Sequence, residues 1–406
     1  MRLAIVSPFL DRQHGTELCI VEQIERFATQ DHWSIELYSQ RVSRVNGVRP
    51  ASGASQNSTD SIVWHKVSDI PGPHLLKYIW WFFANQLQRW WDRTFGKVCP
   101  DLVYSPGINC LDADVIVVHI VFHEFYCKVR SELALRNIPL RRWPLAIHRK
   151  LYYKVSMYLE QKIYRDPEVH LVAVSHLLAR ELASHFQRTD VIVIPNAVDT
   201  FRFAQATRIA RRSESRLFLN FEENEFVLLL IGNDWKSKGL AALLRASAML
   251  IDLPLRILVV GSDDPILFRD FIAELGLRDR LRFEMPSSDV LLFYAAADLY
   301  VSPSLEDSFG LPILEAMACG LPVIASAHAG ASEMIHDGET GFVLRDPQDH
   351  VKLSQLIRRA YSDRRLCQKL GEAASQYAMA NCSWDQNADA TKKFLEATIS
   401  NRGRRA

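Results

Sequence analysis

Residues 298–326 read DLYVSPSLEDSFGLPILEAMACGLPVIAS, and this stretch decides the fold. Its opening run, DLYVSPS, and its closing run, PVIAS, are short and apolar, as buried strands are. Between them LPILEAMAC has helical length, and we expect the helix to begin near Phe309 or Gly310. Pro312 then falls in the first turn, where its missing N–H costs nothing. The stretch predicts a strand, a helix and a second strand of one parallel sheet.

The same rhythm runs through both halves of the chain. In the second half, the strand-like runs FVLLLIGND, LRILVVGSDD and RLRFEM alternate with the helical segments LAALLRASAML, FRDFIAELG and DVLLFYAAA. The first half has LAIVS, SIELYSQ, DLVYSPG, DVIVVHIVF, HLVAVS and VIVIPNAVD, with the helices TELCIVEQIERFA and HLLARELASHF, the latter capped by Ser175. This alternation predicts an α/β protein with two doubly wound, Rossmann-like parallel sheets. Such sheets bind ligands at the carboxyl ends of their strands, so we expect a cleft between two domains.

A chain of 406 residues is too long for one ordinary core, and we expect two domains. Residues 1–203 should form the first and residues 204–382 the second. Residues 383–406 should form a helix that crosses back to the first domain, followed by a basic tail. Residues 204–225 are polar and rich in arginine, and they are predicted to be a connection.

Composition excludes several classes of protein. The net charge of +1 creates no overall positive potential that would attract nucleic acid. The seven cysteines are scattered without CxxC spacing, which favours a reducing compartment over a zinc site or a disulfide framework. No run of 18 apolar residues suggests a membrane span, and the opening MRLAIVSPFL is interpreted as a buried strand, Leu3 to Ser7. A cytoplasmic protein is expected.

Two carboxylates flank the start of the helix in residues 298–326. Asp307 lies just before it, and Glu315 lies inside it, roughly 9 Å further along at about 1.5 Å per residue. The unpaired amides of a helix start suit an anion, so a nucleoside diphosphate sugar would match this spacing. An N-capping aspartate and a surface glutamate explain the spacing equally well.

Two further loops have features of phosphate sites. Lys236 and Lys238 follow the strand LLLIG, and lysine binds phosphate as a point charge. Gly15, in PFLDRQHGTEL, would let the backbone approach a phosphate at a helix start. Solvated lysines and a plain turn glycine are the alternatives, and the absence of GxGxxG disfavours a nicotinamide-type fold.

Metal-like patterns are weak. His119 and His123 lie in a strand-like segment with no HExxH, so His119 is expected to hydrogen-bond a sugar hydroxyl or to be a core histidine. Asp112 and Asp114 form an Asp-x-Asp pair that precedes a buried strand, and no metal site is predicted there.

A basic segment spans residues 128–165. It contains ten basic residues and two acidic residues, Glu132 and Glu160, so its net charge is +8. With the aromatic cluster YIWWFFANQLQRWW of residues 78–91 as companion, it suits an anionic membrane surface or a lipid-linked phosphate acceptor. A solvated helical face is the alternative. The basic residues are Lys128, Arg130, Arg136, Arg141, Arg142, Arg149, Lys150, Lys154, Lys162 and Arg165.

Together these stretches resemble the family-four class of retaining glycosyltransferases, which have the two-domain GT-B fold. That class has an acidic-x-Phe-Gly-x4-Glu element before an Ala-Met-Ala-x-Gly-x-Pro-Val-like run. Here the element is Asp307-Ser308-Phe309-Gly310 with Glu315, followed by AMACGLPVIAS. The resemblance covers nearly the whole chain and is strongest over residues 227–347. The loop GNDWKSKG is also similar to that of bacterial lipopolysaccharide-core glucosyltransferases.

The resemblance implies a function for each candidate residue. Residues 1–203 would bind the acceptor and residues 204–382 the nucleotide sugar. Glu315 would bind the ribose, and Asp307 with the backbone of Phe309, Gly310 and Leu311 would hold the donor sugar. Lys238 and Gly15 would contact phosphate, and His119 would lie near the sugar. The catalytic set is His119, Asp307 and Lys238.

Two positions depart from the family pattern. Asp307 replaces the usual glutamate, and its shorter side chain alters the contact with the sugar. Asn233 stands where the family has a phosphate-binding arginine, and Lys236 is the nearest replacement.

The resemblance therefore implies retaining transfer of a sugar from a nucleotide sugar, with UDP favoured and GDP-mannose an alternative. The acceptor would be a cell-envelope glycan or a lipid-linked saccharide. Fixed cations and helix amides would stabilise the departing diphosphate, so no metal or other cofactor is expected. A sugar-nucleotide epimerase of the same architecture and a non-catalytic membrane-associated binding protein are the alternative hypotheses.

Overall fold

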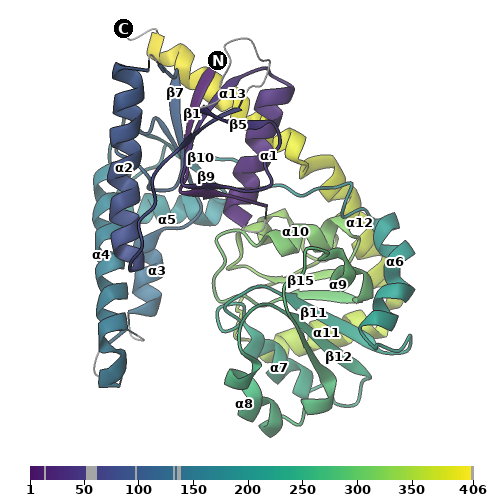
Figure 1. Ribbon diagram of the computed structural model, residues 1–406. Helices are drawn as coiled ribbons and strands as arrows, with labels where there is room; N and C mark the ends of the chain where they lie inside the picture. The colour runs from purple at the N-terminus through teal and green to yellow at the C-terminus, as the bar shows by residue number, and fades with distance from the viewer. Residues whose placement is uncertain (13–14, 52–61, 97, 131–132, 135–138, 404–406) are drawn as a thin grey trace. The chain divides into compact units, whose positions relative to one another are not determined.

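The computed structural model describes residues 1–12, 15–51, 62–96, 98–130, 133–134 and 139–403 (Figure 1). The chain forms two compact units, Met1–Ile194 with Asn387–Ala406, and Pro195–Gln386. Residues 404–406 of the predicted basic tail lie outside the described residues, as do Glu132 and Arg136 of the basic segment. Among the described residues, no helix has both the length and the apolarity needed to cross a bilayer.

The division falls at Ile194 and Pro195, whereas the sequence suggested residues 203 and 204. The segment after Pro195 is anchored in the second unit. The Val198 N–H donates to the Cys382 carbonyl at 2.9 Å, and the ring of Phe203 packs edge-on against Tyr294.

The first unit is built on an eight-stranded parallel sheet in the order β10-β9-β8-β7-β1-β3-β6-β5. The first strand is buried as expected, and its residues 3–6 have no solvent exposure. A separate two-stranded pair joins β2 to β4. The strands are β1 Arg2–Val6, β2 Phe9–Leu10, β3 Ser34–Ser39, β4 Arg41–Val42, β5 Val48–Pro50, β6 Ile62–Lys66, β7 Leu102–Pro106, β8 Val115–Val118, β9 His170–Ala173 and β10 Ile192–Val193.

Helices connect these strands, and the last helix of the chain completes the unit. Gln23 in α1 donates to Asn387 at 2.8 Å and to Thr391 at 3.3 Å, and Lys392 pairs with Asp31. The helices are α1 Gly15–Thr29, α2 His74–Thr94, α3 Phe122–Val129, α4 Trp143–Tyr164, α5 His176–Phe186 and α13 Trp384–Gly403.

The second unit is built on a six-stranded parallel sheet in the order β13-β12-β11-β14-β15-β16. Its central strands are apolar at nearly every position because helices cover both faces of such a sheet. The strands are β11 Phe226–Ile231, β12 Leu255–Val260, β13 Leu281–Glu284, β14 Leu299–Ser302, β15 Val323–Ser326 and β16 Phe342–Leu344; the helices are α6 Gln205–Phe218, α7 Leu240–Ala248, α8 Arg269–Glu274, α9 Leu291–Ala296, α10 Leu311–Ala318, α11 His350–Ser362 and α12 Arg364–Asn381. Two doubly wound parallel sheets confirm the predicted fold class.

One expectation is wrong. Residues 204–225 are not merely a connection, because α6 occupies most of them. Ion pairs hold this polar helix on the domain: Arg212 lies 2.8 Å from Asp298, and the buried Arg216 lies 3.2 Å from the same carboxylate.

Candidate active site

The start of helix α10 is shaped by a glycine. Gly310 is the N-cap residue with φ of 90°, a left-handed conformation that favours glycine. A Cβ at this position would lie 3.1 Å from Oδ2 of Asp307. The helix starts at Leu311 with Pro312 in its first turn, as predicted, and no side chain caps its amides. Pro312 has no N–H and the Ile313 N–H donates to the Gly310 carbonyl at 2.9 Å, so the amides that this helix start can offer to an anion are those of Gly310 and Leu311.

Asp307 is fixed in the loop before α10. Its N–H donates to the His328 carbonyl, and its own carbonyl accepts the Gly330 N–H, both at 3.0 Å. Its Oδ2 lies 2.5 Å from Nζ of Lys238. The loop after β14 and the loop after β11 are thereby joined by one ion pair, and two of the predicted residues meet.

Two glycines let Lys238 reach this position. Gly232 ends β11 with φ of 147°, and a Cβ there would lie 2.9 Å from Cε of Lys238. Gly239, with φ of 77°, has no room for a side chain, since its Cβ would lie 1.9 Å from the Pro303 carbonyl oxygen. The lysine stem consequently passes over the bare backbone of Gly232.

The rest of this loop is held by the loop that follows β12. Oδ1 of Asn233 accepts from the N–H and the hydroxyl of Ser262, at 3.0 and 2.8 Å. The Asp263 carboxylate accepts the Asp234 and Trp235 N–H groups, at 3.1 and 2.6 Å. The Asn233 side chain thus holds the loop after β12 in place.

Lys236 lies in the same loop, and its side chain is exposed. Its backbone carbonyl accepts the Gly239 N–H at 3.2 Å, so the turn that positions Lys238 also fixes the main chain of Lys236. The exposed ammonium remains the predicted second cation for a diphosphate.

Glu315 lies on α10, beyond the first turn. Burial raises its pKa, against the opposing effects of a hydrogen bond from Tyr294 and the charge of Arg202. The Tyr294 hydroxyl donates to Oε2 of Glu315 at 2.6 Å. A half-buried carboxylate that accepts one hydroxyl hydrogen bond retains acceptor capacity for the hydroxyls of a ligand.

The remaining predicted residues lie in the first unit. Gly15 begins α1, which follows β2 along the chain, and His119 directly follows β8 at the carboxyl end of that strand of the eight-stranded sheet. Nε2 of His119 is buried and has no hydrogen-bond partner among the described residues. Burial lowers its pKa to about 4, so the imidazole is neutral near neutral pH. A buried polar atom without a partner is rare, and a ligand hydroxyl would satisfy it.

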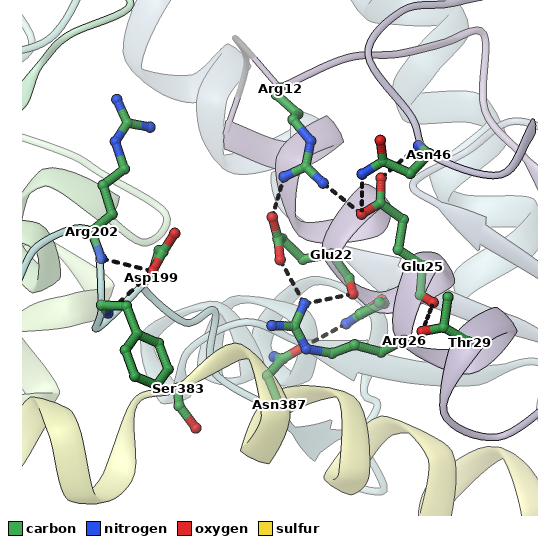
Figure 2. Close-up of polar contacts among 12 residues, drawn as sticks. Arg12, Glu22, Glu25, Arg26, Thr29, Asn46, Asp199, Arg202, Ser383 and Asn387 are labelled. Carbon is green, nitrogen blue, oxygen red and sulfur yellow. Dashed lines mark hydrogen bonds and ion pairs between the residues drawn. The ribbon is translucent and has the colours of Figure 1, made fainter.

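The loop before α1 is tied to that helix. Arg12 pairs with Glu22, and it lies 2.7 Å from Glu25 (Figure 2). These contacts hold the side chain of Arg12 on α1.

The metal-like patterns are used structurally. His123 belongs to α3, not to the strand, and its Nδ1 lies 2.6 Å from the buried Glu160, which also accepts the His123 N–H at 3.0 Å. Asp112 pairs with Arg89 at 2.6 Å, and Asp114 accepts the Val103 N–H at 2.7 Å. Over the described ranges, no three His, Cys, Asp or Glu side chains gather as metal ligands would.

Sequence reasoning missed three residues of the site: Tyr294, Asp263 and Arg202. Tyr294 occupies an apolar position of the segment DVLLFYAAA, and only the polar hydroxyl in a buried run could have marked it. Asp263 was visible only as part of a loop, and Arg202 was assigned to the end of the first predicted domain, residues 1–203.

The architecture has counterparts among solved structures. The crystal structure of WaaG, a glycosyltransferase involved in lipopolysaccharide biosynthesis, matches 96% of this chain and 98% of its own, with a TM-score of 0.73 and 20% identity. HepE of Anabaena in complex with UDP-glucose matches 98% and 100%, with a TM-score of 0.66 and 19% identity. The chain has the GT-B fold, as predicted.

The sequence comparison is more specific for the second unit. Residues 211–377 match the family model of the glycosyl transferases group 1, so the chain carries a domain of that family. The D-inositol 3-phosphate glycosyltransferase of Geodermatophilus obscurus is 37% identical over 250 residues, which are 57% of this chain and 52% of the relative. The chain spans about half the length of the curated relatives it matches.

Proposed function

We propose that this chain is a retaining, metal-independent glycosyltransferase that moves a hexose from a nucleotide sugar to a hydroxyl acceptor. The observation that carries the proposal is the joining of Lys238 to Asp307 beside the uncapped start of α10. A cation and the amides of Gly310 and Leu311 lie where the carboxyl ends of parallel strands lie, and this is where a diphosphate can be bound. The group 1 glycosyltransferase domain contains all of these residues.

In the proposed reaction, the bond between the anomeric carbon and the phosphate oxygen breaks, and its electron pair leaves with the nucleoside diphosphate. The acceptor oxygen bonds to the anomeric carbon from the same face, and its proton passes to a phosphate oxygen. Lys238 and the amides at the start of α10 stabilise the developing negative charge. Glu315 binds the ribose, and the neutral His119 accepts or donates a hydrogen bond at a sugar hydroxyl.

We favour a UDP-sugar as donor, because the structural neighbour HepE was solved with UDP-glucose. GDP-mannose is the alternative. For the acceptor we favour a cell-envelope glycan or lipid-linked saccharide, handled at the inner face of the cytoplasmic membrane. The name of WaaG and the basic segment of residues 128–165 support this choice.

Calorimetric titration with UDP, GDP, ADP and their common sugars tests the donor site. Wild-type protein should bind one nucleotide series, and Glu315→Ala should lose that binding. Glu339→Ala is the matched control, since Glu339 is an exposed carboxylate of the same unit. Binding that survives Glu315→Ala would make this carboxylate structural. Transfer to acceptor in the presence of EDTA then tests metal independence, and release of an isomerised sugar nucleotide without acceptor would instead identify an epimerase.

A further inference from the structure

Helix α2 carries an uninterrupted apolar stripe on its solvent side. The members of this stripe follow one another at intervals of three or four residues, so they share one face of the helix. Each is between 41% and 65% exposed. The opposite face of α2 is buried in the unit and includes Asn85 and Arg89 beside Leu75, Trp81 and Phe82, so the apolar stripe on the solvent side distinguishes α2 from an ordinary surface helix. The stripe consists of Leu76, Trp80, Phe83, Leu87 and Trp91, and it is widened by the exposed Trp90 and Phe95.

Helix α4 lies beside α2 (Figure 1). The rings of Tyr78 and Tyr152 meet edge to face, with centroids 5.6 Å apart, and the Leu75 N–H donates to His148 at 3.4 Å. These contacts hold the two helices together along one side of the unit (Figure 1).

The outer face of α4 combines apolar and cationic side chains. Leu151 and Tyr158 are exposed, and so are Lys154 and Lys162. All of α4 is described, and its single acidic residue, Glu160, is buried under α3, where it accepts the Phe122 N–H. No anion on α4 offsets these cations at the surface.

We propose that the outer faces of α2 and α4 form a membrane-docking surface for an anionic bilayer. The stripe on α2 enters the interfacial region, where tryptophan is favoured, and the lysines of α4 contact lipid headgroups. The proposal deepens the proposed function, because its link to a lipid-linked acceptor rests on that function.

A second copy of the chain would fit this surface poorly. In a symmetric dimer the same patch meets itself, so the cations of α4 would face a surface without compensating anions. Lysine is also depleted at the cores of protein interfaces. An anionic lipid surface instead supplies the missing charge and accepts the apolar stripe.

Co-sedimentation with vesicles of phosphatidylglycerol and phosphatidylethanolamine tests the surface, with phosphatidylcholine vesicles as the neutral comparison. The triple variant Phe83→Gln, Leu87→Gln and Trp91→Gln should lower the partition coefficient on anionic vesicles by about tenfold or more. The double variant Lys154→Gln with Lys162→Gln should lower the partition coefficient on anionic vesicles by about tenfold and leave the partition coefficient on neutral vesicles unchanged.

The control is Leu217→Gln with Phe218→Gln, a pair on α6 that is 78% and 66% exposed, and it should bind vesicles like wild type. Nucleotide affinity should be unchanged in every variant, which separates failure of the surface from failure of the donor site. Should the triple variant fold poorly, Trp90→Phe with Trp91→Phe keeps the apolar surface. This double variant should still bind anionic vesicles, but brominated lipids should quench much less of its tryptophan fluorescence. Equal vesicle binding by wild type and the triple variant would overturn the proposal, as would a wild-type dimer that this variant makes monomeric.

Discussion

The hydroxyl of Tyr294 in α9 donates a 2.6 Å hydrogen bond to the carboxylate of Glu315 in α10. Glu315 is thereby oriented by a neighbouring helix and does not depend on its own rotamer alone. The contact also opposes the effect of burial on the pKa of this carboxylate. Tyr294 is a positioning residue for the proposed ribose contact.

Tyr294→Phe removes this hydrogen bond and keeps the ring that packs on Phe203. We expect the donor KM to rise about tenfold with little change in kcat, because a hydrogen bond to a charged group contributes about 1.5–3 kcal/mol. The acidic limb of nucleotide binding should also move to higher pH, since the hydrogen bond lowers the Glu315 pKa. Steady-state kinetics measures the first effect, and calorimetric titration across the acidic range measures the second. A change in thermal stability alone, with an unaltered pH profile, would contradict this role.

Glu315→Gln should stabilise the unliganded protein while abolishing nucleotide binding. Because burial raises the Glu315 pKa, its stabilising contribution is complete below the unfolded pKa and is lost as pH rises through the folded value. At pH values above the folded pKa the ionised carboxylate therefore destabilises the protein. Melting temperatures of both proteins should differ most near neutral pH and converge in acid. A lower melting temperature for the variant at neutral pH would contradict this expectation.

Lys238→Ala should lower kcat by about 100- to 1,000-fold, the range found when a donor to transition-state charge is removed. The ammonium is held by Asp307 and lies beside the start of α10. Lys236→Ala, in the same loop, should weaken donor binding with a smaller loss of kcat. Steady-state kinetics of the two variants separate these effects, and equal losses would argue against Lys238 as the principal cation.

Gly239→Ala should destabilise the second unit by about 3 kcal/mol or more, because its Cβ would overlap the Pro303 carbonyl in addition to the strain of positive φ. Gly276→Ala is the matched control. That glycine has φ of 68°, but no atom lies within 4 Å of its Cβ position, so only about 1–2 kcal/mol should be lost. Denaturant titration compares the two, and similar midpoints would mean that the loop relaxes.

Much of the fold was predictable from the alternation of apolar runs and amphipathic segments, since parallel strands covered on both faces are continuously apolar. Helix α6 was not predicted, because its stability depends on Asp298, which is far away in the sequence. The C-terminal half of DVIVVHIVF was also misjudged: β8 ends at Val118, and α3 begins at Phe122 with its first amides bonded to Glu160. Partners so distant in the sequence leave no local pattern.

The site was predictable where backbone geometry dictates residue type. Gly310 and Pro312 fix the start of α10, and the glycines around Lys238 fix its loop. The side-chain contacts were not predictable: the hydrogen bonds that the Asn233 oxygen accepts from Ser262 leave no local pattern in the sequence. Tyr294 could not be recognised, because in the sequence of an apolar helix a buried tyrosine fits the hydrophobic pattern as well as a phenylalanine does.

Helix α13 has a consequence for the order in which the protein forms on the ribosome. The first unit includes residues from Asn387 onward, and the side chains of Gln23 and Asp31 bond to Asn387 and Lys392 there. All of residues 195–386 are therefore translated before the first unit has its complete set of contacts. The first unit is translated first but completed last. Part of α1 therefore stays exposed to solvent until α13 has been translated.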